Sequence, residues 1–126
     1  MKLKQLREQA EILAIKQSCF ELDVPPTIPI LIHQIMIDGQ TVGYVATEDY
    51  DTAAGPHIFI AEGYKNPSYL KKVTWIFHNV YCPLMKELGK DILITNCDQC
   101  DFGTTNFLQK LGFQVKHLAI AEFKLY

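Results

Sequence analysis

Residues Asp91–Phe113, DILITNCDQCDFGTTNFLQKLGF, contain the pattern around which the rest of the chain can be arranged. Asp91–Thr95 is predicted to be a strand covered on both faces, because its apolar run has no polar alternation. Asn96–Asp101 has the composition of a turn. Thr104–Leu111 is predicted to be a helix, and Gly112 suits the left-handed position that ends one. The stretch therefore predicts a buried strand, a loop and a short helix.

A long helix is expected just before this unit. Asn66 followed by Pro67 is a typical helix start, since proline lacks only an N–H that has no partner in the first turn. Apolar residues then recur at helical spacing as far as Leu88, and Gly89 is expected to end the helix. Pro83 is expected to kink it, because the helix loses one backbone hydrogen bond there.

The preceding segment predicts antiparallel strands. Ile30–Ile37 is expected to be a strand, and Asp38-Gly39 is a strong signal for a type I′ hairpin turn. Thr41–Thr47 is the expected return strand. The polar and small residues of Glu48–Pro56 predict a loop, and His57–Glu62 (HIFIAE) predicts a third strand.

The two ends of the chain complete the outline. Lys2–Gln17 has apolar residues at helical spacing, so residues 1–22 are expected to form an N-terminal helix. Residues 23–29 hold three prolines and are expected to be an extended linker. Residues 30–126 would form the core, and 114–126 one or two final antiparallel strands. The chain is thus expected to be a single domain, 1–126.

The order of these elements indicates the fold class. A strand, a helix and a buried strand in succession favour a parallel crossover, whereas the preceding hairpin is antiparallel. The expected class is therefore α+β, or mixed α/β, with a central mixed sheet, a β-hairpin, a β-α-β crossover and flanking helices.

Composition excludes some functions. The formal net charge of −2 argues against a protein that binds duplex nucleic acid. No segment approaches the roughly 18–20 apolar residues of a membrane span. The charged N-terminus is unlike a signal peptide, and the four cysteines are expected to be reduced thiols in a cytoplasmic protein.

Two segments resemble the GNAT (Gcn5-related N-acetyltransferase) family. Ile37–Tyr44 (IDGQTVGY) is similar to the family's hairpin, and Asn106–Phe113 (NFLQKLGF) is similar to its late helix, which commonly ends in Lys-Leu-Gly-Phe. With the element order, the resemblance covers about residues 28–125. It implies a GNAT-like sheet and, for an active member, acyl transfer from coenzyme A to an amine.

The resemblance also implies where a cofactor would lie. The pantetheine arm would sit where strands His57–Glu62 and Asp91–Thr95 separate, and the diphosphate would sit on the loop before the long helix. That loop, Gly63–Ser68, lacks the family's Gly-x-Gly, and Pro67 removes one N–H. Leu108 stands where many members have a tyrosine that protonates the departing thiolate.

Residues of a working site follow from the same resemblance. Glu62 is the candidate general base, although a carboxylate at a strand end is more often simply solvated. His57 and His33 are alternative bases. The positions that would contact acetyl-CoA are Ile60, Ala61, Tyr64, Lys65, Asn66, Ser68 and Asn96. Three tyrosines are considered as substitutes for the missing acid: Tyr69, Tyr81 and Tyr126.

Cys97 and Cys100 form a CxxC pair. A zinc site would need a second pair of ligands at a suitable spacing, which the sequence lacks, so no metal is expected. A redox role stays open because the pair follows a strand, but Asp98 would disfavour the thiolate. Structural thiols are the favoured interpretation.

Two functional hypotheses remain. The favoured one is a non-catalytic GNAT-fold protein with a degenerate coenzyme A loop and no cofactor, similar to GNAT-like internal virion proteins of short-tailed phages. It would assemble with protein partners or with itself through the N-terminal helix or the terminal strands, in the cytoplasm or the virion. The alternative is a divergent acetyl-CoA-dependent N-acetyltransferase with Glu62 as base and the backbone of residues 60–62 holding pantetheine.

Overall fold

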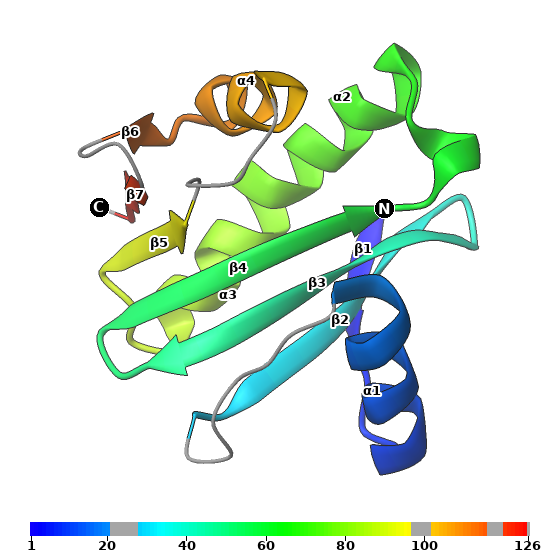
Figure 1. The fold of residues 1–126 in the computed structure, drawn as a ribbon, viewed down its shortest axis with the longest axis horizontal. Coiled ribbons are helices and arrows are strands. Elements are labelled where there is room, and N and C mark those ends of the chain that lie inside the picture. Colours follow the sequence, from blue (N-terminus) through cyan, green and yellow to red (C-terminus); the bar gives the residue numbers. More distant parts are fainter. Residues whose placement is uncertain (21–27, 97–101, 116–119, 126) are drawn as a thin grey trace.

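A mixed β-sheet runs through the computed structural model, which describes residues 1–20, 28–96, 102–115 and 120–125 (Figure 1). Within these residues the sheet has seven strands in the order β1-β2-β3-β4-β5-β7-β6. The β4–β5 pair is parallel, and the other pairs are antiparallel. The predicted mixed sheet with a parallel crossover is confirmed.

The strands are β1 Lys2–Gln5, β2 Ile30–Ile37, β3 Gln40–Tyr50, β4 Ala53–Ile60, β5 Ile92–Asn96, β6 Gln114–Val115 and β7 Ile120–Lys124. The helices are α1 Gln9–Ile15, which continues into a π-helical turn at Lys16–Phe20, a 3₁₀ turn at Glu62–Tyr64, α2 Pro67–Ile76, a π-helical turn at Phe77–Tyr81, α3 Cys82–Glu87 and α4 Phe102–Leu111.

The turn residues behave as the sequence predicts. Asp38 and Gly39 have φ angles of 52° and 76°, the positive values that a type I′ turn between β2 and β3 requires. Gly89 ends α3 with a φ of 84°, a conformation that glycine adopts without a steric penalty. The hairpin turn and the end of the long helix could therefore be predicted from neighbouring residues alone.

The prediction of an N-terminal helix over residues 1–22 is wrong at its start. Lys2–Gln5 is a strand that pairs antiparallel with β2, so that Leu3 lies opposite Ile35. Leu3 packs into the core, while Lys2 and Lys4 are exposed along the edge of the sheet. Exposed lysines on a short edge strand also discourage further strand pairing.

The predicted loop at Glu48–Pro56 is also wrong. β3 continues to Tyr50 and β4 begins at Ala53, so a tight hairpin turn occupies the middle of the segment. Asp49 and Glu48 remain in a strand because each finds a partner from elsewhere: Lys90 contacts Asp49, and His57 contacts Glu48. The polar side chains that made this segment resemble a loop instead find hydrogen-bond partners within the fold.

The long helix is continuous from α2 through α3. Its π-helical turn at Phe77–Tyr81 immediately precedes Cys82 and Pro83. Because Pro83 has no N–H for the carbonyl of Asn79, the local widening of the helix agrees with the predicted disturbance there.

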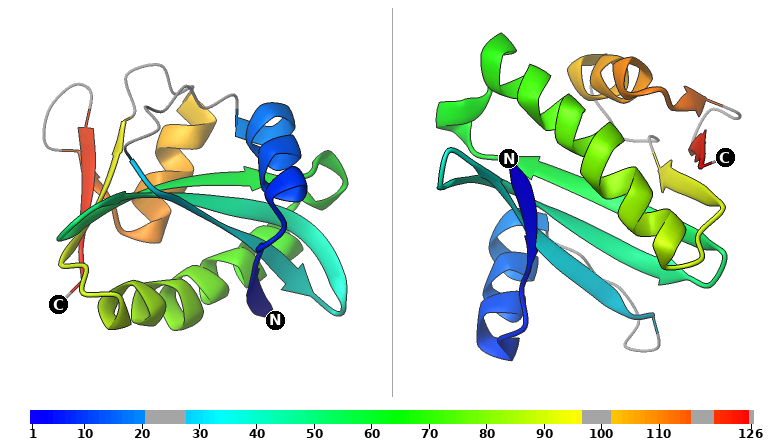
Figure 2. Two further views of the ribbon diagram at one scale, coloured as in Figure 1. Left: turned by 90° about the horizontal axis from the view of Figure 1, so that it is seen from below. Right: turned by 180° about the vertical axis from the view of Figure 1, so that it is seen from behind.

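The helices cover both faces of the sheet (Figure 2). In the left view α1 lies on one face and the α2–α3 helix on the other. The main core forms between the sheet, the α2–α3 helix and α4, and it includes Phe77, Met85, Leu93 and Leu111. A smaller cluster around Leu6, Ile32 and Ala46 lies under α1.

Some sequence predictions fall on residues outside the described ranges. These are residues 23–27 of the expected linker, the Cys97 and Cys100 pair, and Tyr126.

Candidate functional site

Strands β4 and β5 separate soon after they begin. Only two residue pairs join them in parallel, Ala53 with Ile92 and Ala54 with Leu93. β4 then continues along β3 as far as Ile60, while β5 follows β7 (Figure 1). The carboxyl ends of two parallel strands therefore lie apart, which is where ligands bind in many α/β folds.

Pro56 accounts for the end of the β4–β5 ladder. The N–H of Ala61 donates to the carbonyl of Val42 at 3.0 Å, so odd-numbered residues of β4 hydrogen-bond toward β3. The backbone of even-numbered residues therefore faces β5. The next bond after Ala54 would need the N–H of Pro56, which proline lacks.

Beyond Pro56 the same alternation leaves an unpaired backbone edge. The N–H and C=O groups of Ile58 and Ile60 face away from β3, and no strand in the described residues pairs with them. We call this stretch, Pro56–Ile60, the free edge of β4. It presents hydrogen-bonding groups at strand spacing, as a peptide-like ligand requires.

The loop before α2 is largely closed on itself. Asn66 caps the helix. Its side-chain oxygen accepts a hydrogen bond from the N–H of Tyr69 at 3.1 Å, and its backbone carbonyl accepts one from the N–H of Leu70 at 2.9 Å. Pro67 has no N–H. Among the described residues of the first turn of α2, Ser68 therefore has the backbone N–H that remains free to bind an anion. The predicted diphosphate position thus offers few of the N–H groups that such sites use.

The side chains of this loop also pair among themselves. Lys65 Nζ lies 2.8 Å from Glu62 Oε1. Tyr64 donates from its hydroxyl to Gln40 Oε1 at 3.1 Å, and its ring packs edge-on against Tyr69. Glu62 lies in the 3₁₀ turn rather than in the predicted strand, and its side chain is 88% exposed.

The candidates for a catalytic acid lie in packed positions. Leu108 packs against the main core from α4. Tyr81 is buried and hydrogen-bonds Thr47 Oγ1 at 2.8 Å, and burial raises the pKa of its hydroxyl. Tyr69 packs beside Tyr64 at the start of α2. Tyr69 and Tyr81 are therefore held by packing or hydrogen bonds within the fold, and Leu108 has no group that can donate a proton.

A polar array on the β3–β4 hairpin was not predicted as a unit. The carboxylate of Glu48 accepts from His57 Nε2 with one oxygen and from the Tyr50 hydroxyl with the other. Glu48 is buried, whereas the His57 side chain is 33% exposed. The hydrogen bond to Glu48 raises the pKa of Tyr50 to about 12, so its hydroxyl stays a donor. We refer to Glu48, His57 and Tyr50 as the hairpin array.

The array lies beside the free edge, on the face of the sheet that carries α1. His57 directly follows Pro56, and its side chain points to the same face as Phe59, which contacts Phe20 at the end of the α1 segment. His33, the other histidine candidate, pairs across β2–β3 with Val45 on the opposite face and is buried. The sequence signal for the array was His57 itself, but Glu48 fell in a predicted loop.

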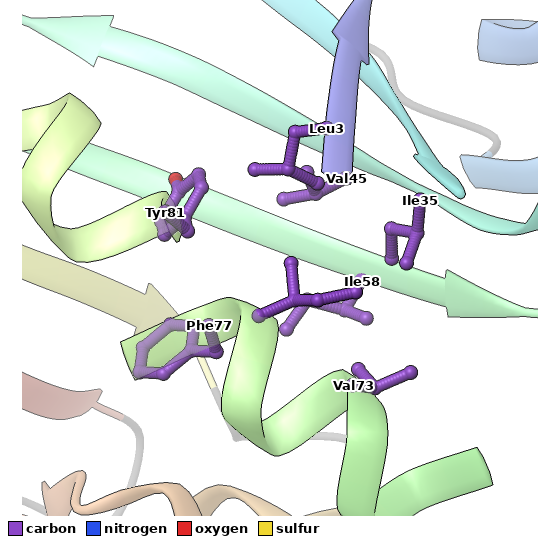
Figure 3. Close-up of a pocket in the computed structure, with 8 residues that line it drawn as sticks. Leu3, Ile35, Val45, Ile58, Val73, Phe77 and Tyr81 are labelled. Carbon is purple, nitrogen blue, oxygen red and sulfur yellow. The ribbon is translucent and has the colours of Figure 1, made fainter. Parts of the chain in front are cut away.

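The structure also contains a small cavity between the sheet and α2 (Figure 3). Its volume is about 20 Å³, far below the few hundred Å³ of a ligand pocket. Its walls are apolar, so it has no group to hold a water molecule. It is a packing defect lined by Leu3, Ile35, Val45, Ile58, Val73, Ile76, Phe77 and Tyr81.

The described residues contain no group of three His, Cys, Asp or Glu side chains placed to hold a metal ion. No helix among them has the length and apolar character needed to cross a membrane.

Comparison with known proteins gives a consistent result for the fold. No protein-family model and no curated protein sequence matches the chain. Among solved structures, the PaiA N-acetyltransferase of Thermoplasma acidophilum, in complex with coenzyme A, is 18% identical with a TM-score of 0.62, over 90% of this chain and 67% of that one.

Two other solved structures match over nearly their whole length. Tetrahymena GCN5 is 11% identical with a TM-score of 0.67, over 100% of this chain and 97% of that one. Aminoglycoside 6′-acetyltransferase type Ii is 12% identical with a TM-score of 0.68, over 100% of this chain and 98% of that one. At these identities the likeness establishes the fold alone. The chain has the GNAT fold.

Proposed function

We propose that this protein binds the pantetheine arm of an acyl-coenzyme A along the free edge of β4 and transfers the acyl group to an amine. The observation that carries the proposal is the unpaired backbone of Ile58 and Ile60 where β4 and β5 separate. One structurally similar protein, PaiA, is described as an N-acetyltransferase in complex with coenzyme A.

The chemistry of the edge suits this ligand. A pantetheine arm carries amide groups, and amides can hydrogen-bond an unpaired strand edge much as a neighbouring strand does. Ile60 would supply backbone groups at this edge. Ala61 would act by its position only, since its own N–H already donates to Val42. Asn96 ends β5 on the other side of the separation.

The protein would bind the diphosphate weakly. Ser68 offers one N–H, and Lys65 would have to exchange its ion pair with Glu62 for a contact with phosphate. Asn66 is committed to capping the helix, and Tyr64 bonds Gln40. We therefore expect most of the binding energy to come from the pantetheine arm.

The closed loop favours a second candidate function. A GNAT-fold protein whose α2 N-terminus is capped by its own Asn66, and whose α4 carries Leu108, could serve as a non-catalytic assembly protein. Its contacts would be made by the N-terminal segment or the terminal strands, as in a phage internal virion protein. No cofactor would then bind, and Glu62 would be an ordinary solvated carboxylate.

Calorimetric titration with acetyl-CoA and with S-acetylpantetheine separates the two candidates. Acyl transfer predicts that both ligands bind and that their dissociation constants differ by less than about tenfold, or 1.4 kcal/mol. A much larger preference for acetyl-CoA would contradict the expectation that the diphosphate contributes little binding energy. Absence of binding at millimolar concentrations of both ligands would overturn the proposal in favour of the assembly protein.

A further inference from the structure

We propose that His57 is the proton acceptor of this site and that Glu48 and Tyr50 are the residues that position it. This inference rests on the proposed acyl transfer and assigns its base to the hairpin array in place of the exposed Glu62.

The hydrogen bonds of the ring identify the reactive nitrogen. Nε2 of His57 contacts the Glu48 carboxylate, which in its ionised form can only accept, so the neutral ring carries its proton on Nε2. Nδ1 then has a free lone pair. It has no hydrogen-bond partner in the part of the chain that the structure describes, and it is not a buried atom. A carboxylate behind a partly exposed imidazole is the arrangement of a general base.

The carboxylate is held in place on both sides. Glu48 is 9% exposed, and its second oxygen accepts from the Tyr50 hydroxyl. Gly55 leaves the space for this contact, because a Cβ added there would lie 3.1 Å from the Tyr50 ring and 3.5 Å from Glu48 Cβ. Two hydrogen bonds and a close packing surface therefore fix the orientation of Glu48, and through it that of His57.

Glu62 lacks these features. Its side chain is almost fully exposed and is paired with Lys65. Water competes for every contact it could make, and nothing fixes its rotamer apart from a solvent-screened ion pair. Its position in the 3₁₀ turn also places it beyond the end of the free edge.

The proposed reaction is balanced without further reactants. Nδ1 of His57 takes a proton from the substrate ammonium group and later releases it to solvent. The neutral amine nitrogen then forms a bond to the thioester carbonyl carbon. The carbon–sulfur bond breaks, coenzyme A leaves as the thiolate, and the second amine proton passes to that sulfur. The products are an amide, coenzyme A and the one proton that His57 released.

The test combines acetyl-CoA binding with turnover, using spermidine and Nα-acetyllysine as probe amines. His57→Ala should bind acetyl-CoA as the parent does, but its kcat should fall by about 10²–10⁴-fold. Added imidazole should restore part of the lost rate, which it would not do if the ring were only structural. Glu48→Gln should lower kcat by at least about tenfold with little change in KM, and Tyr50→Phe should have a smaller effect.

The controls separate failure of this inference from failure of the proposed function. Glu87→Gln, which alters an exposed carboxylate outside the site, should leave kcat unchanged, and thermal unfolding should show each variant folded. If acetyl-CoA does not bind the parent protein, or the parent acetylates neither amine, the proposed function fails. If the parent is active but His57→Ala retains the full rate or lacks imidazole rescue, the assignment of His57 is overturned.

Discussion

At the scale of single residues, Gly43 shows how closely β3 and β4 approach. A Cβ at this position would overlap the backbone carbonyl oxygen of Phe59, which cannot move without displacing β4. Gly43→Ala is therefore expected to destabilise the fold by about 2–3 kcal/mol. Chemical denaturation measures the change. Gly63→Ala is the matched control, since a Cβ there meets nothing within 4 Å, and an equal loss in both variants would contradict the steric explanation.

Lys90 and Asp49 join the end of the long helix to the β3–β4 turn. Lys90 is 8% exposed, and it also donates to the carbonyl of Asp51. Its hydrogen bond to Asp49 lowers the pKa of that carboxyl below 3.8. Because the folded state binds the proton less readily, this contribution is complete above pH ~4 and is lost as the pH falls through the lowered pKa.

We expect Asp49→Asn to cost about 1–2 kcal/mol at neutral pH, a value reduced because Asp49 is partly exposed. Asp38→Asn is the control, since Asp38 lies 3.8 Å from Lys72 in an exposed pair and should cost almost nothing. Denaturation at pH 7 and pH 3 checks both. The Asp49 interpretation fails if the difference between parent and Asp49→Asn does not shrink at the lower pH.

His33 is a buried polar residue with an unmet hydrogen-bonding group. Its Nδ1 has no partner in the described residues, and burial lowers its pKa below 6.5. The folded state thus favours the neutral ring. Stability is full above pH 6.5 and falls as the pH drops toward the lowered pKa, because the unfolded chain takes up the proton first.

His33→Leu should therefore stabilise the protein by about 1 kcal/mol at pH 7, since it removes a buried unsatisfied group. It should also remove part of the stability loss between pH 6.5 and 5. Thermal melts across this range provide the measurement. A parent and a variant with parallel pH dependence would show that His33 does not titrate on unfolding.

At the scale of elements, Pro56 determines how far β4 pairs with β5. Pro56→Val supplies an N–H that faces β5, so we expect one further ladder bond and a stability gain of about 1 kcal/mol. The same change should weaken acetyl-CoA binding by narrowing the separation. Hydrogen exchange at the new amide is the measurement. Fast exchange of the valine amide introduced by this substitution, with unchanged ligand affinity, would show that Pro56 is not the cause.

The elements also show what the sequence could and could not predict. The Asp38-Gly39 turn, the long helix and its glycine end depend on neighbouring residues, and they were predicted correctly. β1 was missed because it contains one apolar residue, Leu3, whose spacing to Leu6 is that of a helix. The β3–β4 turn was missed because the partners of Asp49 and Glu48, Lys90 and His57, are brought to them only by the fold.

The candidate site divides in the same way. Pro67 and the single glycine of the loop before α2 could be seen in the sequence, as could Leu108 in the late helix. The free edge of β4 could not be predicted, because the strand toward which the Pro56 backbone faces depends on where β4 begins. The hairpin array could not be predicted without the pairing of β3 and β4. In that register Glu48 lies opposite Gly55, and His57 is two residues further along β4 on the same face of the sheet.

At the scale of the whole molecule, the GNAT fold leaves the function to be decided by the site. The fold supplies the separated strands, whereas this chain supplies Pro56, the capped loop and the hairpin array. We propose the free edge of β4 as the binding surface for a pantetheine thioester, and residue-resolved hydrogen exchange tests this proposal most directly.

The measurement compares the amides of Ile58 and Ile60 with and without acetyl-CoA at about one hundred times its dissociation constant. We expect exchange at both amides to slow by up to about 100-fold, while Phe59, whose backbone faces β3, changes only as much as the rest of the sheet. Unchanged exchange at Ile58 and Ile60 with saturating acetyl-CoA, or protection confined to other segments, would contradict the claim.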